Sequence, residues 1–265
     1  MDRAVCSWCQ FQNDAQRVSC LACGAPLSAA KVVSESGWRA APRMRDMAEF
    51  RVGNSGCRIA GEVVPAAEFT LADGDAVFFE QHTMLWKERG VSLKGARVRG
   101  GSGRLVAGLP YAVIEARGPG RIAFTRDAAG EVVVLPLHSG LEVDVRGHAF
   151  IAASENVSYE FTKIKGLVNV LHGGEGMYMD RFVSGPAAGL LLLHGCGNVL
   201  QRRLADGEKV LVEPGGFLYK DSTVAMTTVK APVGGGAGHK NAYLAELAGP
   251  GRVGIQSMYV HFHTD

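Results

Sequence analysis

Four of the six cysteines lie within the first 23 residues, in two Cys-x-x-Cys pairs. Cys6 and Cys9 form the first pair, and Cys20 and Cys23 form the second. Each pair can direct two thiolates at one ion, and four thiolates in a tetrahedron are typical ligands of a structural zinc. A segment of about 27 residues is too short to fold on a hydrophobic core alone, so the metal would supply its folding free energy. The sequence therefore predicts one structural Zn2+ bound by these four cysteines.

The alternative, two disulfides, depends on the redox compartment. Residues 1–6 contain no apolar core of a signal peptide. The longest apolar stretch, near residues 190–193, is far shorter than the roughly 20 residues of a membrane-spanning helix. We therefore expect a cytoplasmic protein with reduced thiols and no membrane span. Its net charge of +2 is too small to predict nucleic-acid or membrane binding from charge alone.

Residues 6–27 resemble the short zinc ribbons of bacterial proteins. They also resemble the Ran-binding-protein type of zinc finger, which has the same cysteine spacing and an Asn at the position of Asn13. Fingers of that type bind RNA or ubiquitin. Arg17 agrees with the RNA-binding members, but position 14 has no aromatic ring on which a base could stack, and the charges of the segment cancel. Trp8 and Arg17 are the candidate binding residues of this segment, and RNA binding by the segment alone is not expected.

The remaining cysteines and a terminal histidine pair are the other candidates for chemistry. Cys57 and Cys196 are isolated in the sequence, and burial is the expectation for both. His194 would share a strand face with Cys196 without forming a catalytic pair. His261 and His263 could bind a metal from one strand face, as in cupins, but they lie at the end of the chain and no Glu follows them. We therefore expect no enzyme active site.

Glycine marks the boundary between two parts of the chain. Of 35 glycines in 265 residues, 33 lie in residues 51–265. Glycine at this frequency, without a Gly-X-Y period, disfavours long helices and favours many short strands with turns. The composition predicts a zinc ribbon at 1–27, a linker or extension at 28–50, and a β domain at 51–265.

The β domain contains an internal repeat. Residues 71–91, 137–157 and 204–224 share Leu, Gly, Val and Val at the same places, and the first and third copies have nine identities at an offset of 133. Gly74, Gly140 and Gly207 predict hairpin turns with positive φ. Alternating apolar residues such as Val143 and Val145 predict half-buried strands. His82 and His148 occupy equivalent positions where the third copy has Gly215, which fits a turn better than a metal site.

A second motif, Gly-Pro at residues 118, 185 and 249, is interpreted as the start of a unit. No hairpin follows its last copy, so we expect the C-terminal strand to pair with the first unit and close the structure. The sequence thus predicts an all-β domain with pseudo-threefold symmetry. Its units lie near 51–100, 101–170 and 171–231, with a closing strand at 249–263.

Residues 173–178, Arg181-Phe182, Gly185-Pro186 and Lys220-Asp221 resemble the altered-inheritance-of-mitochondria protein 24 family. The resemblance covers most of 51–265 and is most specific in 166–230. It implies an all-β fold similar to the tryptophan RNA-binding attenuation protein, a variant of the double-stranded β-helix. The family includes a yeast mitochondrial member implicated in inner-membrane organisation, and it has no established catalytic residues. Glu175, in a Gly-rich turn, and Arg181 are candidate binding residues, although a purely structural turn also explains Glu175.

These observations favour a non-enzymatic, zinc-containing binding or scaffold protein that engages a protein partner. An RNA-binding regulator is the alternative, suggested by the attenuation-protein resemblance and by Arg39, Arg43 and Arg45. A cupin-like metalloenzyme is less favoured. The sequence makes no prediction of oligomeric state.

Overall fold

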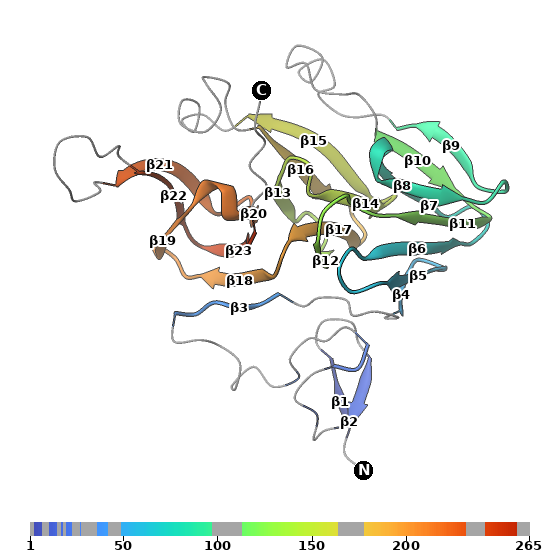
Figure 1. Ribbon diagram of the computed structural model, residues 1–265, viewed down its shortest axis with the longest axis horizontal. Helices are drawn as coiled ribbons and strands as arrows, with labels where there is room; N and C mark the ends of the chain where they lie inside the picture. Colours follow the sequence, from blue (N-terminus) through green and yellow to red (C-terminus); the bar gives the residue numbers. More distant parts are fainter. Residues whose placement is uncertain are drawn as a thin grey trace.

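The computed structural model is built of antiparallel β-strands, which confirms the predicted all-β class (Figure 1). The structure describes residues 3–6, 11–14, 17, 20–22, 27, 36–41, 49–96, 113–163, 178–231 and 242–258. Among these residues the only helical elements are two 3-10 turns, η2 (Gln81–Thr83) and η3 (Pro214–Gly216). None of the helices in the described part of the chain is long and apolar enough to span a membrane.

Six strands recur three times along the chain in the same order, and we call each set a unit. Unit 1 contains β6 (Ala66–Leu71), β7 (Ala76–Glu80), β8 (Met84–Lys87), β9 (Ser92–Gly95), β10 (Val113–Arg117) and β11 (Gly120–Phe124). Unit 2 contains β12 (Gly130–Leu137), β13 (Glu142–Arg146), β14 (Phe150–Ser154), β15 (Val157–Lys163), β16 (Tyr178–Ser184) and β17 (Gly189–Cys196). Unit 3 contains β18 (Val199–Leu204), β19 (Lys209–Val212), β20 (Phe217–Asp221), β21 (Ala225–Ala231), β22 (Ala242–Ala248) and β23 (Gly251–Gln256).

The strands agree with the sequence repeat. Both β18 and η3 lie 133 residues after their counterparts β6 and η2, which is the offset of the sequence copies. Gly74, Gly140 and Gly207 all have positive φ, as the hairpin turns require. The repeat is therefore structural, while an attenuation-protein-like fold and a threefold rotation between the units stay predictions.

Each unit is made of two three-stranded antiparallel layers. In unit 1, β11 lies between β6 and β8, and β10 lies between β7 and β9. Units 2 and 3 repeat this pattern. The chain crosses from one layer to the other at the Gly-Pro pairs, where space is short: a Cβ on Gly118 would lie 2.3 Å from the carbonyl oxygen of Ala72.

Two expectations about the Gly-Pro motif are therefore wrong. The motif lies between the fifth and sixth strands of a unit rather than at a unit start. The last copy leads into β23, which pairs with β18 and β20 of its own unit and not with unit 1. A Gly-Pro before an apolar run looks alike in sequence whether the run opens or completes a unit. Residues 259–263 of the predicted closing strand lie outside the described residues.

Strand pairing also joins neighbouring units into larger sheets. The third strand of unit 2, β14, pairs with β7 of unit 1, and β20 of unit 3 pairs with β13 of unit 2. Aromatic side chains fill the space behind the first junction: the ring centroids of Phe150 and Phe182 are 4.7 Å apart, and those of Phe78 and Phe150 are 5.5 Å apart. The core thus extends from one unit into the next.

The residues before unit 1 pack on the β domain. The strand β3 (Arg39–Ala40) pairs with β18, whereas β4 (Glu49–Val52) and β5 (Ser55–Ala60) extend the sheet of β6. A hairpin of β1 (Arg3–Val5) and β2 (Gln12–Asp14) precedes them. Cys6 and Cys20 belong to the same hydrophobic cluster as buried residues of β5 and β6. The described part of the extension therefore packs on the β domain: β3 pairs with unit 3, and β4, which begins at Glu49, extends the sheet of unit 1.

We predict that Gly254→Ala destabilises the fold by about 1–3 kcal/mol because it overpacks a full core. A Cβ on Gly254 would lie 2.1 Å from Cε1 of the buried Tyr219 ring. Gly56 is the matched control, since a Cβ there meets nothing within 4 Å. Chemical denaturation should show Gly56→Ala within about 0.5 kcal/mol of wild type, and equal losses from both variants would contradict the packing argument.

Candidate functional site

A cavity of about 400 Å³ lies where side chains from all three units meet. Unit 1 contributes His82 from η2, and the loop between β11 and β12 contributes Arg126. The turn between β13 and β14 contributes Arg146 and His148. The strands β17 and β23 add the last polar side chains used below, His194, Cys196 and Gln256.

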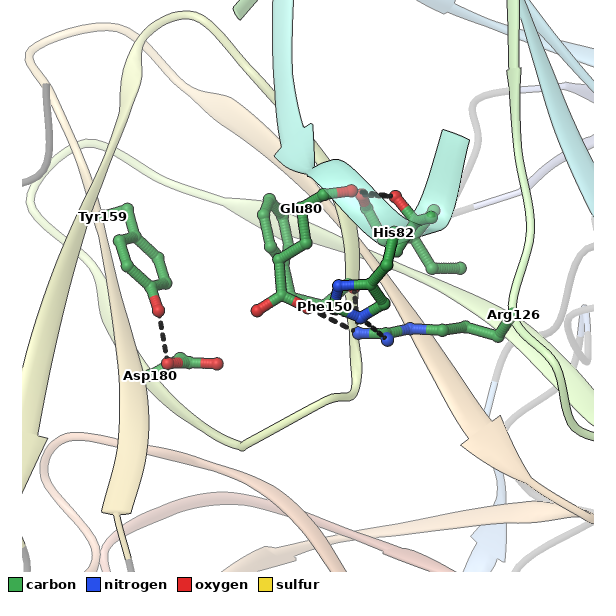
Figure 2. A network of polar contacts seen from close by, with 8 residues as sticks. Glu80, His82, Arg126, Phe150, Tyr159 and Asp180 are labelled. Carbon is green, nitrogen blue, oxygen red and sulfur yellow. Dashed lines mark hydrogen bonds and ion pairs between the residues drawn. The ribbon is translucent and has the colours of Figure 1, made fainter. Parts of the chain in front are cut away.

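Arg126 is the centre of the polar network (Figure 2). Its Nη2 donates to Glu80 Oε2 at 2.8 Å and to the carbonyl oxygen of Phe150 at 2.7 Å. Its Nη1 contacts Nε2 of His82 at 2.5 Å. Because both Arg126 and Glu80 are buried, the pair must be formed for either charge to be tolerated in the core. The network links β7 and η2 of unit 1 to β14 of unit 2.

Hydrogen bonds to backbone carbonyl oxygens hold η2 and the Arg126 loop in place. Thr83 Oγ1 donates to the carbonyl oxygens of Glu80, at 2.8 Å, and of Ile151, at 3.3 Å, which holds η2 against β14. The amide of Thr125 donates to the carbonyl oxygen of Thr83 at 2.8 Å, so the loop carrying Arg126 is held beside η2.

The same cluster has the geometry of a possible metal site. One ligand atom each from Glu80, His82 and His148 lies within 4.8 Å of the others. However, the guanidinium of Arg126 already contacts both Glu80 and His82. A metal ion bound here would have to displace the buried Arg126 guanidinium, which is paired with Glu80, one of the candidate ligands. The donor set is therefore occupied by Arg126, and we assign no metal to it.

His148 has an unusual backbone conformation, with φ of +68°. It is the only residue other than glycine with positive φ among the described residues. Its ring centroid is 6.2 Å from that of His82, so the two equivalent histidines of the repeat face each other across the unit 1–unit 2 junction. Their equivalent in unit 3, Gly215, instead accepts hydrogen bonds through its carbonyl oxygen.

Arg146 makes the corresponding link between units 2 and 3. Its Nη1 donates to the carbonyl oxygens of Gly215 and, at 3.3 Å, of Pro214. Gln256 also donates to the Gly215 carbonyl oxygen at 3.4 Å, and its Oε1 accepts from the Cys196 amide at 3.1 Å. Burial lowers the pKa of Arg146. Two arginines therefore connect the turns of successive units through the same cavity.

His194 and Cys196 both line the cavity from β17, as expected for residues that share a strand face. Burial raises the pKa of the Cys196 thiol and lowers the pKa of His194. A thiol with a raised pKa is mostly protonated at neutral pH and is a poor nucleophile. The ring of His194 packs on Gly130, where a Cβ would lie 2.8 Å from Nε2. This environment does not activate the Cys196 thiol.

Arg181, a predicted binding residue, lies at the junction of units 2 and 3. Its Nε donates to Asp144 Oδ1 at 2.7 Å, and Lys220 Nζ donates to Asp144 Oδ2 at 2.7 Å. Burial raises the pKa of Asp144, but the hydrogen bonds from Arg181 and Lys220 outweigh it and hold that pKa below its usual value. Sequence reasoning misses Asp144 as the centre of this triad, because its alternation with Val143 and Val145 suggests an exposed side chain.

The described half of the cysteine set is buried in the N-terminal segment. Cys6 and Cys20 are buried, and Asn13 Nδ2 donates to Cys20 Sγ at 3.4 Å. Asn13 Oδ1 in turn accepts from the Leu21 amide at 2.8 Å, which holds the turn after Cys20. Arg17 is exposed. The other predicted site residues, Cys9, Cys23, Trp8, Glu175, His261 and His263, lie outside the described residues.

Comparison with known proteins identifies the family. The model of the AIM24 family, described as mitochondrial biogenesis AIM24, matches residues 57–258. The chain belongs to this family. A crystal structure of a Streptococcus pyogenes protein is similar in fold, with 20% identity, a TM-score of 0.58, and coverage of 78% of this chain and 94% of that one. A search of curated proteins found no match.

The AIM24 match has a boundary that bears on the site. It begins in β5 and ends just after β23, so it includes all three units and the polar cavity. The four N-terminal cysteines lie outside it. The cysteine segment is therefore an addition to the AIM24 part of this chain, packed on that part through Cys6 and Cys20.

We predict that Arg126→Met lowers the free energy of unfolding by about 3–5 kcal/mol, because it leaves the Glu80 carboxylate buried without its cation. The double variant Glu80→Leu, Arg126→Met should lose less than Arg126→Met alone. The control is Arg117→Met, since Arg117 and Glu115 form a half-exposed ion pair whose loss should cost about 0–1 kcal/mol. Denaturation midpoints check these variants together with Glu80→Leu alone, and additivity of the Glu80 and Arg126 effects would contradict the coupling.

Proposed function

We propose that this AIM24-family chain is a non-enzymatic scaffold protein, in which a zinc-bound N-terminal segment is attached to a three-unit β domain that engages a protein partner. The observation that carries this proposal is how the cavity uses its charged groups. Arg126 and Arg146 line the cavity, and both donate hydrogen bonds to acceptors in neighbouring units. Cys196 is not activated as a nucleophile. The polar side chains of the cavity therefore connect neighbouring units.

The zinc proposal depends on whether the cysteine environment suits a metal. Two of the four cysteines are buried, and the Asn13 side chain donates a hydrogen bond to one sulfur. Such a donor stabilises a thiolate, as groups around structural zinc sites do. Cys6, Cys9, Cys20 and Cys23 would hold the ion, which would stabilise the segment. This proposal requires a reducing compartment such as the cytoplasm.

Purified protein should contain one zinc per chain by elemental analysis. Cys6→Ser and Cys20→Ser should each lower the zinc affinity at least about tenfold, because each variant removes one of the four thiolate ligands. Cys196→Ser is the control, since Cys196 belongs to unit 2, and it should retain one zinc. Full zinc content in Cys20→Ser, or none in the wild type after purification without chelators, would contradict the site.

The partner proposal is tested by purification from the native cell. We expect the full chain to co-purify with a protein at a fixed molar ratio, and this complex should survive nuclease treatment. Comparison of the wild type with Cys6→Ser shows whether the N-terminal segment takes part in recognition. Loss of the complex after nuclease treatment, with steeply salt-dependent binding to single-stranded RNA, would favour the RNA-binding alternative instead. A chain that elutes without any partner would contradict the scaffold proposal.

A further inference from the structure

Two strand edges in the described part of the chain do not follow the pairing rule of the three units. The second strand of a unit pairs with the third strand of the next unit: β7 with β14, and β13 with β20. The second strand of unit 3, β19, has no such neighbour and ends the sheet β19-β22-β21. The third strand of unit 1, β8, ends the sheet β4-β5-β6-β11-β8. In Figure 1, β19 lies at the left of the molecule and β8 at the right.

The two internal junctions share one register. At the first, Phe79 is opposite Ala152 and Phe78 is opposite Ala153. At the second, Val145 is opposite Tyr219 and Asp144 is opposite Lys220. Shifting the first pairs by the repeat offsets of 66 and 67 gives the second pairs.

The repeat offsets also give the pairs of a third junction between β19 and β8, because Val212 lies 67 residues after Val145 and Trp86 lies 66 residues before Ala152. Val212 would lie opposite Trp86, and Leu211 would lie opposite Lys87. A strand pair in this register would provide hydrogen-bond partners for the β19 and β8 edges that end their sheets among the described residues.

Side chains on β19 and β8 are more exposed than their counterparts at the two internal junctions. Trp86 is 38% exposed, whereas its counterpart at the second junction, Tyr219, is fully buried. Leu211 is 50% exposed, whereas its counterparts Phe78 and Asp144 are buried. Apolar side chains on unpaired edge strands favour pairing with another strand. Natural edge strands usually carry protective charges or prolines, and Leu211 lies where unit 2 has the ion-paired Asp144.

We propose that copies of this chain associate head to tail, with β19 of one copy pairing antiparallel with β8 of the next in the register of Val212 with Trp86. The surface on one copy differs from the surface on the other, so the association is heterologous and builds rings or open filaments rather than closed dimers. The inference goes beyond the scaffold function and does not depend on it, because neither the zinc site nor a second protein takes part.

The test changes the charge of one exposed position, Leu211, in the full chain. Leu211→Asp would place a carboxylate opposite Lys87 of the next copy, like the pair of Asp144 and Lys220 at 2.7 Å. Leu211→Lys would place two ammonium groups opposite each other, which destabilises strand pairing. Sedimentation velocity should show wild-type species larger than dimers that grow with concentration. We expect Leu211→Lys to weaken association by at least about tenfold and Leu211→Asp to associate as well as wild type or better.

A charge exchange tests the register itself. Adding Lys87→Glu to Leu211→Lys should restore association, because the ammonium introduced at position 211 of one copy would then meet the carboxylate introduced at position 87 of the next. The control is Val63→Lys, at a position that is 70% exposed in the turn between β5 and β6, and it should leave association unchanged. Unchanged circular dichroism and melting temperature would show that each variant is folded.

The proposal is overturned if the wild type is monomeric at all accessible concentrations or forms only a closed dimer. It is also overturned if Leu211→Asp and Leu211→Lys weaken association equally, because that result indicates apolar adhesion without strand pairing. A failure of Lys87→Glu to rescue Leu211→Lys overturns the register. None of these results bears on zinc content or on a protein partner, so the scaffold proposal is tested separately.

Discussion

The hydrogen-bonding requirement of β-strand edges organises this molecule. A three-stranded antiparallel layer leaves two rows of amides and carbonyls unpaired, and such a layer buries too little apolar surface to be stable alone. Joining β7 to β14 and β13 to β20 satisfies four of these edges within one chain. Because sheets are shared across the junctions, the units are not independent domains. Units 1 and 3 each contribute one layer to a shared sheet, whereas unit 2 contributes both of its layers.

Buried charged groups bridge the units at both junctions. Glu80 and Arg126 connect units 1 and 2, while Asp144, Arg181 and Lys220 connect units 2 and 3. A buried charge is tolerated only when its partner is in place, so a register error at either junction would leave charges unpaired. The aromatic cluster of Phe78, Phe150 and Phe182 provides non-directional burial at the first junction. Apolar contacts there bury surface whatever the register, whereas the ion pairs favour one register of strand pairing.

Part of the candidate site could be predicted from local spacing, and part could not. The Cys-x-x-Cys pairs and Asn13 lie within one short segment, so their proximity follows from chain geometry. The equivalence of His82 and His148 also follows from the repeat, and the structure places their rings 6.2 Å apart. By contrast, Arg126 cannot be recognised from the sequence, because no nearby residue indicates that it pairs with Glu80, 46 residues earlier in the chain. Asp144 escapes prediction because both faces of β13 are covered, so alternation no longer separates buried from exposed positions.

The sequence by itself determined the all-β class, the three copies of the hairpin, their offsets and the glycines with positive φ. These features depend on interactions between residues close in the chain, and turn chemistry is read locally. Only the tertiary structure decided which strands pair across units, that β23 completes unit 3 instead of closing on unit 1, and which charges are buried. Strand edges are chemically alike along their backbones, so the choice between two possible partners depends on the packing of side chains far apart in sequence. The same reason explains why local sequence patterns do not show that β8 and β19 end their sheets in the described part of the chain.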